Sequence, residues 1–266
     1  MERDFHFFRY QKAILHYSKY GNGPKPIFCF HGFGLTGAMF SELEKILARD
    51  YTVYSFDLFF HGQSEWLSDE EAISEKFWSE LITAFTKENN ITSFSLLGFS
   101  IGARSVWSLA NTLPEKINEI IAIAPDGVTN SGWYSLATGS KTTRFLFKTL
   151  LSKKEYINTL LNVGMAMMLM PRLTVRFAKC QLRTAKQRQK VYLTWVTYRK
   201  LKANTKSLAE SINKLKIPIT FYIGEQDKVI RKKSIHSLVK KLDNQNVILL
   251  KAGHLNLINA VIKYLE

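Results

Sequence analysis

The sequence predicts a doubly wound α/β domain with a mostly parallel sheet and helices on both faces. Short apolar runs rich in β-branched and aromatic residues recur along the chain, with helix-like segments between them, as is typical of βα units. The runs lack clean alternation of apolar and polar residues, as expected for strands covered on both faces. Between residues 127 and 215 this rhythm stops and the sequence has a helical character. We therefore expect one α/β core interrupted by a helical insertion.

We expect eight strands in this core. The first two are separated by a short polar step and are expected to form an antiparallel pair, whereas the others suit a parallel sheet. In chain order the expected strands are residues 5–9, 13–18, 27–30, 52–58, 94–98, 120–124, 219–223 and 247–250. The expected core helices are residues 39–48, 70–88, 103–113, 232–242 and 255–265.

Length and composition are those of an ordinary folded protein. The chain has 266 residues, of which 46% are hydrophobic and 22% charged, within the usual range for globular domains. Its longest apolar segment, residues 160–170, is shorter than the roughly 20 residues needed to cross a bilayer. Residues 1–10 carry charges of both signs, unlike a secretory signal, and the two cysteines have no metal-like spacing. We expect a cytoplasmic protein, with attachment to the inner face of a membrane as an open alternative.

The net charge of +15 is concentrated in the helical insertion. Residues 130–210 hold 16 Lys and Arg against two Asp and Glu, whereas residues 1–129 hold 11 against 16. The turn-forming sequences Pro125-Asp126-Gly127 and Lys216-Ile217-Pro218 mark the two ends of the insertion. The expected domains are residues 1–126 and 216–266, the two parts of the core, and residues 127–215, a basic helical insertion.

The stretch Gly98-Phe99-Ser100-Ile101-Gly102 carries the first signal of chemistry. It follows an expected strand and precedes an expected helix, so the serine stands on a sharp strand-to-helix turn. A serine hydroxyl becomes a good nucleophile only when a base takes its proton, and such a turn projects it toward that base. The sequence therefore makes Ser100 a candidate nucleophile.

Candidate partners for Ser100 follow the ends of other expected strands. Asp227 stands just beyond residues 219–223, where Glu225 competes with it, and His254 follows the last strand. A loop with two glycines, His31-Gly32-Phe33-Gly34, follows the first parallel strand and can turn a backbone N–H toward a reacting centre. Since ligand crevices of open α/β sheets lie beyond the carboxyl ends of the strands, these groups are expected to converge.

The order serine, aspartate, histidine along these strands resembles the α/β-hydrolase superfamily, over nearly the whole chain. The resemblance implies the hydrolase sheet with a helical cap inserted after the sixth strand. It also implies Ser100 as nucleophile, His254 as general base and acid, and Asp227 as the group that orients the imidazole. The backbone N–H groups of Phe33 and Ile101 would form the oxyanion hole, and no cofactor or metal is required.

Residues 57–64, Asp57-Leu58-Phe59-Phe60-His61-Gly62-Gln63-Ser64, resemble a family loop commonly written D-x-x-G-H-G-x-S. Phe60 stands where the family usually has glycine, so the backbone there is expected to adopt a conformation that a bulky residue tolerates. The resemblance makes Asp57 and His61 structural rather than an acid–base pair. It also gives His31 the role of supporting the loop of residues 31–34.

The inserted segment would form the cap that selects the substrate. Apolar residues at helical spacing and the methionines at positions 165, 167, 168 and 170 suit either an acyl chain or packing within the cap. Its many cations suit a solvated surface, anionic lipid headgroups or an anionic substrate such as an acyl-CoA. No nucleic-acid recognition motif accompanies them.

The sequence thus predicts a serine hydrolase that cleaves a carboxylic ester, or a thioester, through an acyl-enzyme intermediate, with water as the second substrate. The same triad could instead cleave an amide or a C–C bond. A third alternative is a protein that binds membranes or anions on a hydrolase scaffold, with the basic cap as its working surface.

Overall fold

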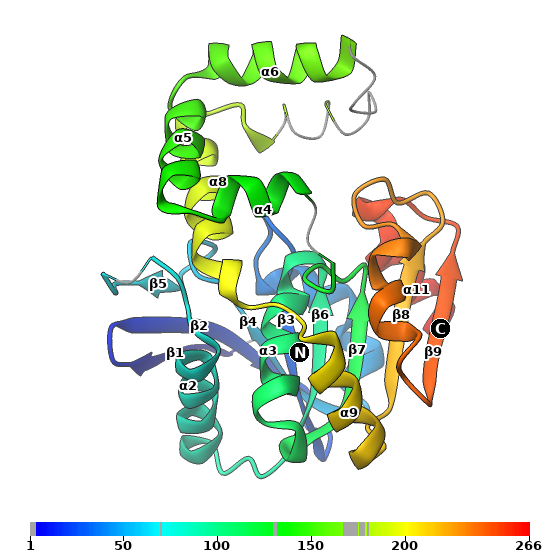
Figure 1. Ribbon diagram of the computed structural model, residues 1–266. Helices are drawn as coiled ribbons and strands as arrows, with labels where there is room; N and C mark the ends of the chain where they lie inside the picture. Colours follow the sequence, from blue (N-terminus) through cyan, green and yellow to red (C-terminus); the bar gives the residue numbers. More distant parts are fainter. Residues whose placement is uncertain (1–3, 70, 130–131, 167–174, 176–178, 180) are drawn as a thin grey trace. The chain divides into compact units, whose positions relative to one another are not determined.

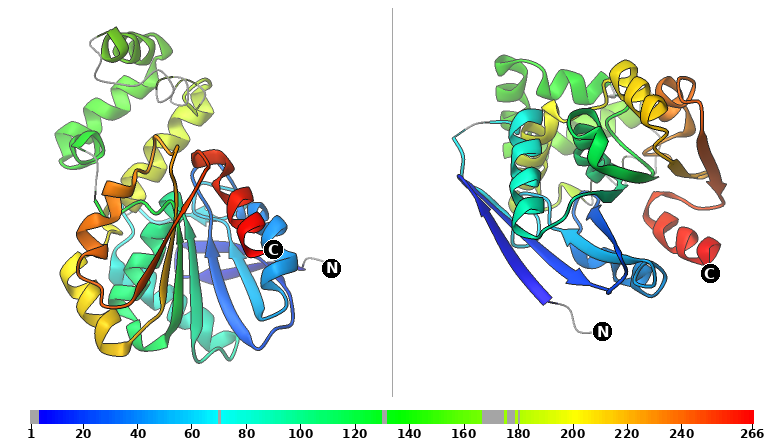
Figure 2. Two further views of the ribbon diagram at one scale, coloured as in Figure 1. Left: turned by 90° about the vertical axis from the view of Figure 1, so that its right-hand side faces the viewer. Right: turned by 90° about the horizontal axis from the view of Figure 1, so that it is seen from below.

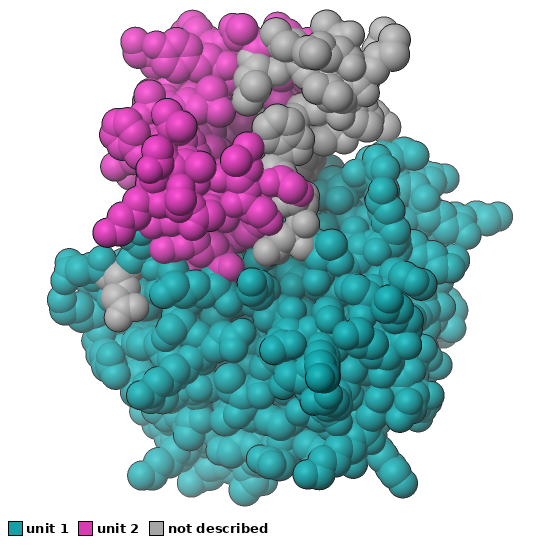
Figure 3. Space-filling model, viewed as in Figure 1, with its two compact units in different colours: residues 1–129, 200–266 teal, residues 130–199 magenta. Residues whose placement is uncertain are grey.

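The computed structural model describes residues 4–69, 71–129, 132–166, 175, 179 and 181–266. The chain forms two compact units. Unit 1 comprises Met1–Thr129 and Lys200–Glu266, and unit 2 comprises Asn130–Arg199 (Figure 3). Both ends of the chain therefore belong to unit 1, and unit 2 is an insertion into it (Figure 1).

Unit 1 is built on one mostly parallel sheet. Its strands lie in the order β1-β2-β4-β3-β6-β7-β8-β9; the first two pairings, β1 with β2 and β2 with β4, are antiparallel and the rest are parallel. These strands are β1 (Asp4–Tyr10), β2 (Ala13–Tyr20), β3 (Lys25–Phe30), β4 (Tyr51–Phe56), β6 (Phe94–Phe99), β7 (Ile117–Ile123), β8 (Ile219–Gly224) and β9 (Gln245–Leu250).

The expectation of eight strands is wrong by one, because the sheet has nine. The additional strand, β5 (Glu65–Trp66), pairs antiparallel with Ala13 and Ile14 of β2. Two residues contain too little sequence for a run or an alternation, so the pattern that identified the other strands could not reveal this one. It closes the loop that follows β4.

Helices cover both faces of the sheet (Figure 2). One face carries α2 (Glu75–Glu88), α3 (Ala103–Thr112) and α9 (Thr205–Leu215), and the other carries η1 (Gly37–Leu43), α1 (Glu44–Leu47) and α11 (Leu257–Leu265). Short helical turns complete the unit: η2 (Ser100–Gly102), η3 (Pro114–Lys116), η5 (Lys232–Ile235), α10 (His236–Val239) and η6 (His254–Asn256). The helix α9, expected in the insertion, packs on α3 within unit 1.

Aromatic side chains fill the core between α2 and the sheet. Phe28 of β3 stacks on Phe94 with ring centroids 4.4 Å apart, and it meets the edges of Phe56 and Phe85. All four side chains are fully buried, and each large aromatic residue buried in this way contributes strongly to stability. This packing fixes the strand that leads into the glycine loop at residues 31–34.

Unit 2 is helical in its described parts. It contains α4 (Gly132–Thr138), α5 (Lys141–Ser152), α6 (Lys154–Ala166), α8 (Ala185–Thr197) and the first residues of η4 (Tyr198–Lys200). Ser140 and Thr184 each form a capping box that begins α5 and α8. No helix of the described residues is long and apolar enough to span a membrane. Of the methionines noted in the sequence, those at positions 167, 168 and 170 lie outside the described residues.

Candidate active site

Ser100 occupies a sharp turn between β6 and α3. Its φ angle is +52°, in the left-handed region that few residues other than glycine adopt. The flanking glycines are required by close approach of the backbone: a Cβ on Gly98 would lie 2.8 Å from Cα of Ala103, and one on Gly102 would lie 2.1 Å from the carbonyl oxygen of Phe30. The turn therefore presses the start of α3 against the end of β3, where the glycine loop begins.

The structure brings Ser100, His254 and Asp227 into one hydrogen-bonded line. His254 Nε2 lies 3.0 Å from Ser100 Oγ, and His254 Nδ1 lies 2.7 Å from Asp227 Oδ2. The Asp227 side chain is fully buried and that of His254 is 10% exposed. With the Nδ1 proton directed at the carboxylate, Nε2 is left to accept the proton of the serine hydroxyl.

The loop after β8 selects Asp227 rather than Glu225 for this line. The second carboxylate oxygen of Asp227 accepts hydrogen bonds from the backbone N–H groups of Val229 and Ile230, at 2.7 and 2.8 Å. Glu225 is exposed, two residues earlier on the same loop. The ring of Phe99 stacks on His254 with centroids 5.2 Å apart. The imidazole is therefore held by an aromatic ring, and the Asp227 carboxylate that it contacts is held by backbone N–H groups.

The glycine loop packs directly against the serine turn. A Cβ on Gly32 would lie 2.7 Å from the Phe99 ring and 3.4 Å from Cβ of Ser100. The Leu35 N–H bonds the Gly32 carbonyl at 3.2 Å, and Gly34 has a φ angle of +78°, so Phe33 lies inside a tight turn. None of the described residues accepts a hydrogen bond from the Phe33 N–H. Ile101 lies in the first turn of the helical segment, where backbone N–H groups have no intrahelical acceptor.

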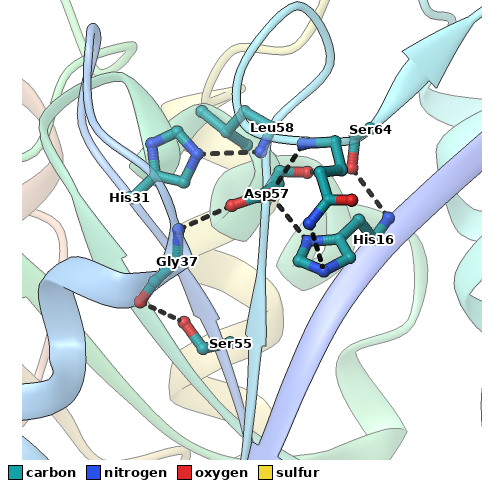
Figure 4. A network of polar contacts seen from close by, with 8 residues as sticks. His16, His31, Gly37, Ser55, Asp57, Leu58 and Ser64 are labelled. Carbon is teal, nitrogen blue, oxygen red and sulfur yellow. Dashed lines mark hydrogen bonds and ion pairs between the residues drawn. The ribbon is translucent and has the colours of Figure 1, made fainter. Parts of the chain in front are cut away.

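A buried polar network supports this loop from the side of β4 (Figure 4). His31 is fully buried; its Nε2 accepts a hydrogen bond from Leu58 N–H at 2.9 Å, and its Nδ1 lies 2.7 Å from the Gly32 carbonyl oxygen. Asp57 accepts hydrogen bonds from the N–H groups of Gly37 and Gln63. The network ties the loops that follow β3 and β4 to each other.

The partner of Asp57 is His16, which the sequence analysis did not single out. His16 Nδ1 lies 2.7 Å from Asp57 Oδ2, and both side chains are buried. His61 instead accepts a hydrogen bond from Gly34 N–H at 3.0 Å, through Nε2. A histidine in the middle of the buried strand β2 was the one available signal, because a buried polar side chain needs a partner.

Phe60 adopts a left-handed backbone conformation, of the kind that favours glycine. Its φ angle is +67°, and Gly62 follows at +51°. The left-handed conformation costs a residue with a side chain roughly 1–2 kcal/mol. A Cβ on Gly62 would lie 1.7 Å from Asp57 Oδ2. The loop therefore keeps a glycine-like course at Phe60, contrary to the expectation from the sequence.

Cys29 offers no competing nucleophile near this site. It lies in β3, and its burial raises the pKa of the thiol far above the ordinary value, which disfavours the reactive thiolate. Among the described residues, no three His, Cys, Asp or Glu side chains are grouped as metal ligands.

Comparison with known proteins identifies the family. The α/β hydrolase fold family matches residues 25–261, which include the sheet from β3 onward, the serine turn and the loops of Asp227 and His254. The chain belongs to this α/β-hydrolase family. Its fold is accordingly the α/β-hydrolase fold, with nine strands in the sheet.

The relatives of this α/β-hydrolase chain include proteins named as an esterase and a hydrolase, and one named as an acetyltransferase component. A pimeloyl-[acyl-carrier protein] methyl ester esterase of Aeromonas hydrophila is 31% identical over 106 residues, 40% of this chain and 39% of the relative. A 3-hydroxybutyrate-oligomer hydrolase of Cupriavidus necator is 26% identical over 127 residues, 44% and 43% of the two chains. These alignments span less than half the length of either relative.

Solved structures share the fold over nearly the whole chain. A hydrolase from Pseudomonas aeruginosa superposes with a TM-score of 0.70 at 16% identity, covering 98% of this chain and 96% of that chain. A thermophilic esterase from Thermogutta terrifontis gives a TM-score of 0.68 at 14% identity, covering 99% and 96%. At these identities the likeness is one of fold.

Proposed function

We propose that this α/β-hydrolase cleaves a carboxylic ester with Ser100 as its nucleophile. The supporting observation is the hydrogen-bonded line from Ser100 Oγ through His254 to Asp227. In this mechanism Ser100 Oγ attacks the ester carbonyl while His254 Nε2 takes the hydroxyl proton. The imidazolium, stabilised by Asp227, then gives that proton to the leaving alcohol, which departs and leaves an acyl-enzyme.

Water completes the reaction. His254 Nε2 takes a proton from a water molecule, which attacks the acyl carbonyl. The imidazolium then returns that proton to Ser100 Oγ as the acyl-enzyme bond breaks, which releases the carboxylic acid and restores the serine hydroxyl. We assign stabilisation of the oxyanion in both steps to the backbone N–H groups of Phe33 and Ile101. The close packing of the Gly32 loop on Ser100 supports this assignment, and loss of one such donor typically costs on the order of 100-fold in turnover.

Replacement of Ser100 by alanine tests the proposal. The variant removes only the hydroxyl, so it is expected to keep the circular dichroism spectrum of the wild-type protein. Hydrolysis of p-nitrophenyl esters is expected to fall at least ~1,000-fold, because the covalent route is lost. Turnover at the wild-type rate in the folded variant would contradict the assignment.

The choice among ester, thioester, amide and C–C bonds is a question of substrate. The names of relatives favour acyl-oxygen or acyl-sulfur bonds: a methyl ester esterase, and a thioesterase domain from the curacin biosynthetic pathway, which has the same fold. We therefore expect p-nitrophenyl esters and acyl thioesters to be cleaved faster than matched anilides or diketones. A faster rate for an anilide or a diketone would favour the alternative.

An apolar acyl group suits the loops of unit 1 that follow the parallel strands. Leu35, Val229 and Leu255 follow strands β3, β8 and β9 and are 36%, 42% and 69% exposed. Since parallel strands end at the same sheet edge, these apolar side chains lie on loops at the edge that carries Ser100. We also propose that the inserted helices act as the cap: the insertion leaves unit 1 beside the nucleophile, where Asp126 N–H bonds the Ser100 carbonyl at 3.0 Å.

A second function, adhesion to anionic membranes, is favoured by the exposed face of α5 in unit 2. Phe145 and Leu146 are 68% and 59% exposed there, and the lysines at 141 and 148 lie on the same exposed side of the helix. Residues 130–199 hold 13 Lys and Arg and a single acid. Exposed apolar side chains flanked by lysines are typical of helices that lie in a lipid interface.

Vesicle sedimentation tests this second function. The wild-type protein is expected to bind phosphatidylglycerol vesicles at low salt and to release at high salt, because the attraction is electrostatic. Charge reversal at Lys141 and Lys148, or Phe145→Ser with Leu146→Ser, should abolish binding. The matched control reverses two exposed lysines of unit 1, Lys45 and Lys87, and should bind like the wild-type protein. An equal loss of vesicle binding in both charge-reversed variants would contradict the proposal that the exposed face of α5 binds the membrane.

A further inference from the structure

A buried arginine joins the helix of the nucleophile to both segments that link unit 1 with the insertion. Arg104 lies in the first turn of α3 and is fully buried. Its Nε donates to Asp126 Oδ2 at 2.6 Å, where the chain has just left β7. A second nitrogen of the guanidinium donates to the carbonyl of Leu201 at 3.3 Å, where the chain has just re-entered unit 1.

Asp126 connects Arg104 to the backbone of Ser100. Its backbone N–H donates to the carbonyl oxygen of Ser100 at 3.0 Å, and its own carbonyl accepts a hydrogen bond from Trp107 Nε1 at 2.8 Å. The carboxylate is held by Arg104. Each polar group of Asp126 therefore bonds a residue of the serine turn or of α3.

The two linking segments are also bonded to each other on this arginine. Ala203 N–H donates to the Gly127 carbonyl at 2.9 Å. Gly127 has a φ angle of +88°, and a Cβ there would lie 2.8 Å from Arg104 Cγ. The segment that leaves unit 1 thus packs on the Arg104 side chain. Since the returning segment also bonds Arg104, displacement of either segment would act on this one side chain.

We propose that Arg104 is a positioning residue for Ser100. Through Asp126 and Leu201 it connects the positions of both linking segments to the backbone of Ser100. The proposal rests on Ser100 being the nucleophile. The planar guanidinium of a buried arginine donates hydrogen bonds to a carboxylate and a carbonyl in fixed directions. The ammonium group of a lysine cannot reproduce this arrangement of donors. Arg104→Lys therefore keeps the charge and loses the geometry.

The test compares Arg104→Lys with a matched buried arginine. Arg188 in unit 2 is also buried and also donates to backbone carbonyls, so Arg188→Lys is the control. Arg104→Lys is expected to lower kcat for a p-nitrophenyl ester on the order of 10-fold to 100-fold, the size expected for a misplaced reacting group. KM should change less than about twofold, since the substrate contacts are untouched. Arg188→Lys alters contacts within unit 2 alone and should leave kcat unchanged.

Limited trypsin digestion supplies the second readout. Lys200 and Lys202 are exposed in the returning segment, and cleavage after them should be faster in Arg104→Lys than in the wild-type protein or Arg188→Lys. Wild-type kcat in folded Arg104→Lys overturns the proposal, as does an equal loss in both variants. A loss of kcat without faster cleavage overturns the coupling to the linking segment.

If Arg104→Lys does not fold, Trp107→Phe decides. It keeps a buried aromatic ring and removes the hydrogen bond to the Asp126 carbonyl, together with part of the packing of the indole. A lower kcat at unchanged KM supports the coupling, and wild-type kinetics overturn it. Failure of the nucleophile assignment is distinguishable, because it would appear as activity retained in Ser100→Ala.

Discussion

The side chains of the candidate site are held mainly by backbone groups. Asp227 keeps one oxygen for His254 while two N–H groups of its own loop fix the other. Ser100 is held through its carbonyl by the Asp126 N–H. Backbone donors cannot change rotamer, so they hold the Asp227 carboxylate and the serine turn in fixed positions.

Replacement of Asp227 by asparagine tests the role of that carboxylate. An amide at this place can turn its NH₂ group toward His254, which would put the imidazole in the wrong tautomer. We expect ester turnover to fall about 1,000-fold to 10,000-fold, with the fold retained by circular dichroism. The matched control is Glu225→Gln, on the exposed side of the same loop, which should stay within about twofold of the wild-type rate. The reverse pattern would assign the acid to Glu225.

Some contacts of single residues could be predicted from the sequence and others could not. The order Ser100, Asp227, His254 could be predicted because each follows an apolar strand. The pairing of Asp57 with His16 could not, since it joins residues 41 positions apart through a register that only the folded sheet defines. At Phe60 the sequence suggested a departure from the glycine loop, but the φ angle there is positive, within a turn that the His61 N–H closes on the Leu58 carbonyl at 2.9 Å.

At the scale of elements, the serine turn depends on how closely β3, β6 and α3 approach. Gly102→Ala would place a methyl group 2.1 Å from the Phe30 carbonyl oxygen. We expect a loss of at least ~2 kcal/mol in the free energy of unfolding, measured by urea denaturation, because overpacking moves backbone on both sides. Ester turnover should fall as well.

A matched glycine separates this steric effect from the general effect of adding a methyl group. A Cβ on Gly132, at the start of α4, would meet no atom within 4 Å. Gly132→Ala should therefore change the free energy of unfolding by less than about 1 kcal/mol, toward greater stability. Equal destabilisation by both substitutions would contradict the packing argument at the turn.

The elements that the sequence predicted best are those with long, uniform apolar runs. The central strands β3, β6, β7 and β8 are buried on both faces, and their runs were clear. The one expected helix at residues 232–242 is instead two short pieces, η5 and α10. Helix α9 is an amphipathic helix that follows the helical insertion without an intervening strand, so the sequence pattern alone could not assign it to unit 1.

At the scale of the whole molecule, charge and chemistry are divided along the chain. The serine turn, the glycine loop and the loops of Asp227 and His254 all belong to unit 1, whereas residues 130–199 hold 13 of the 37 Lys and Arg and one of the 22 acids. From the break in the βα rhythm the sequence predicted an insertion at residues 127–215, whereas unit 2 comprises residues 130–199. The role of the inserted helices as a cap stays a prediction.

Intact-mass spectrometry after treatment with a fluorophosphonate tests the central claim most directly. A serine that an adjacent base has activated attacks the phosphorus of this reagent, forming an O–P bond as fluoride leaves. We predict one adduct per wild-type molecule, mapped by peptide sequencing to Ser100, and none in Ser100→Ala. An adduct on another residue, or labelling of Ser100→Ala at the wild-type rate, would contradict the assignment of Ser100 as the nucleophile.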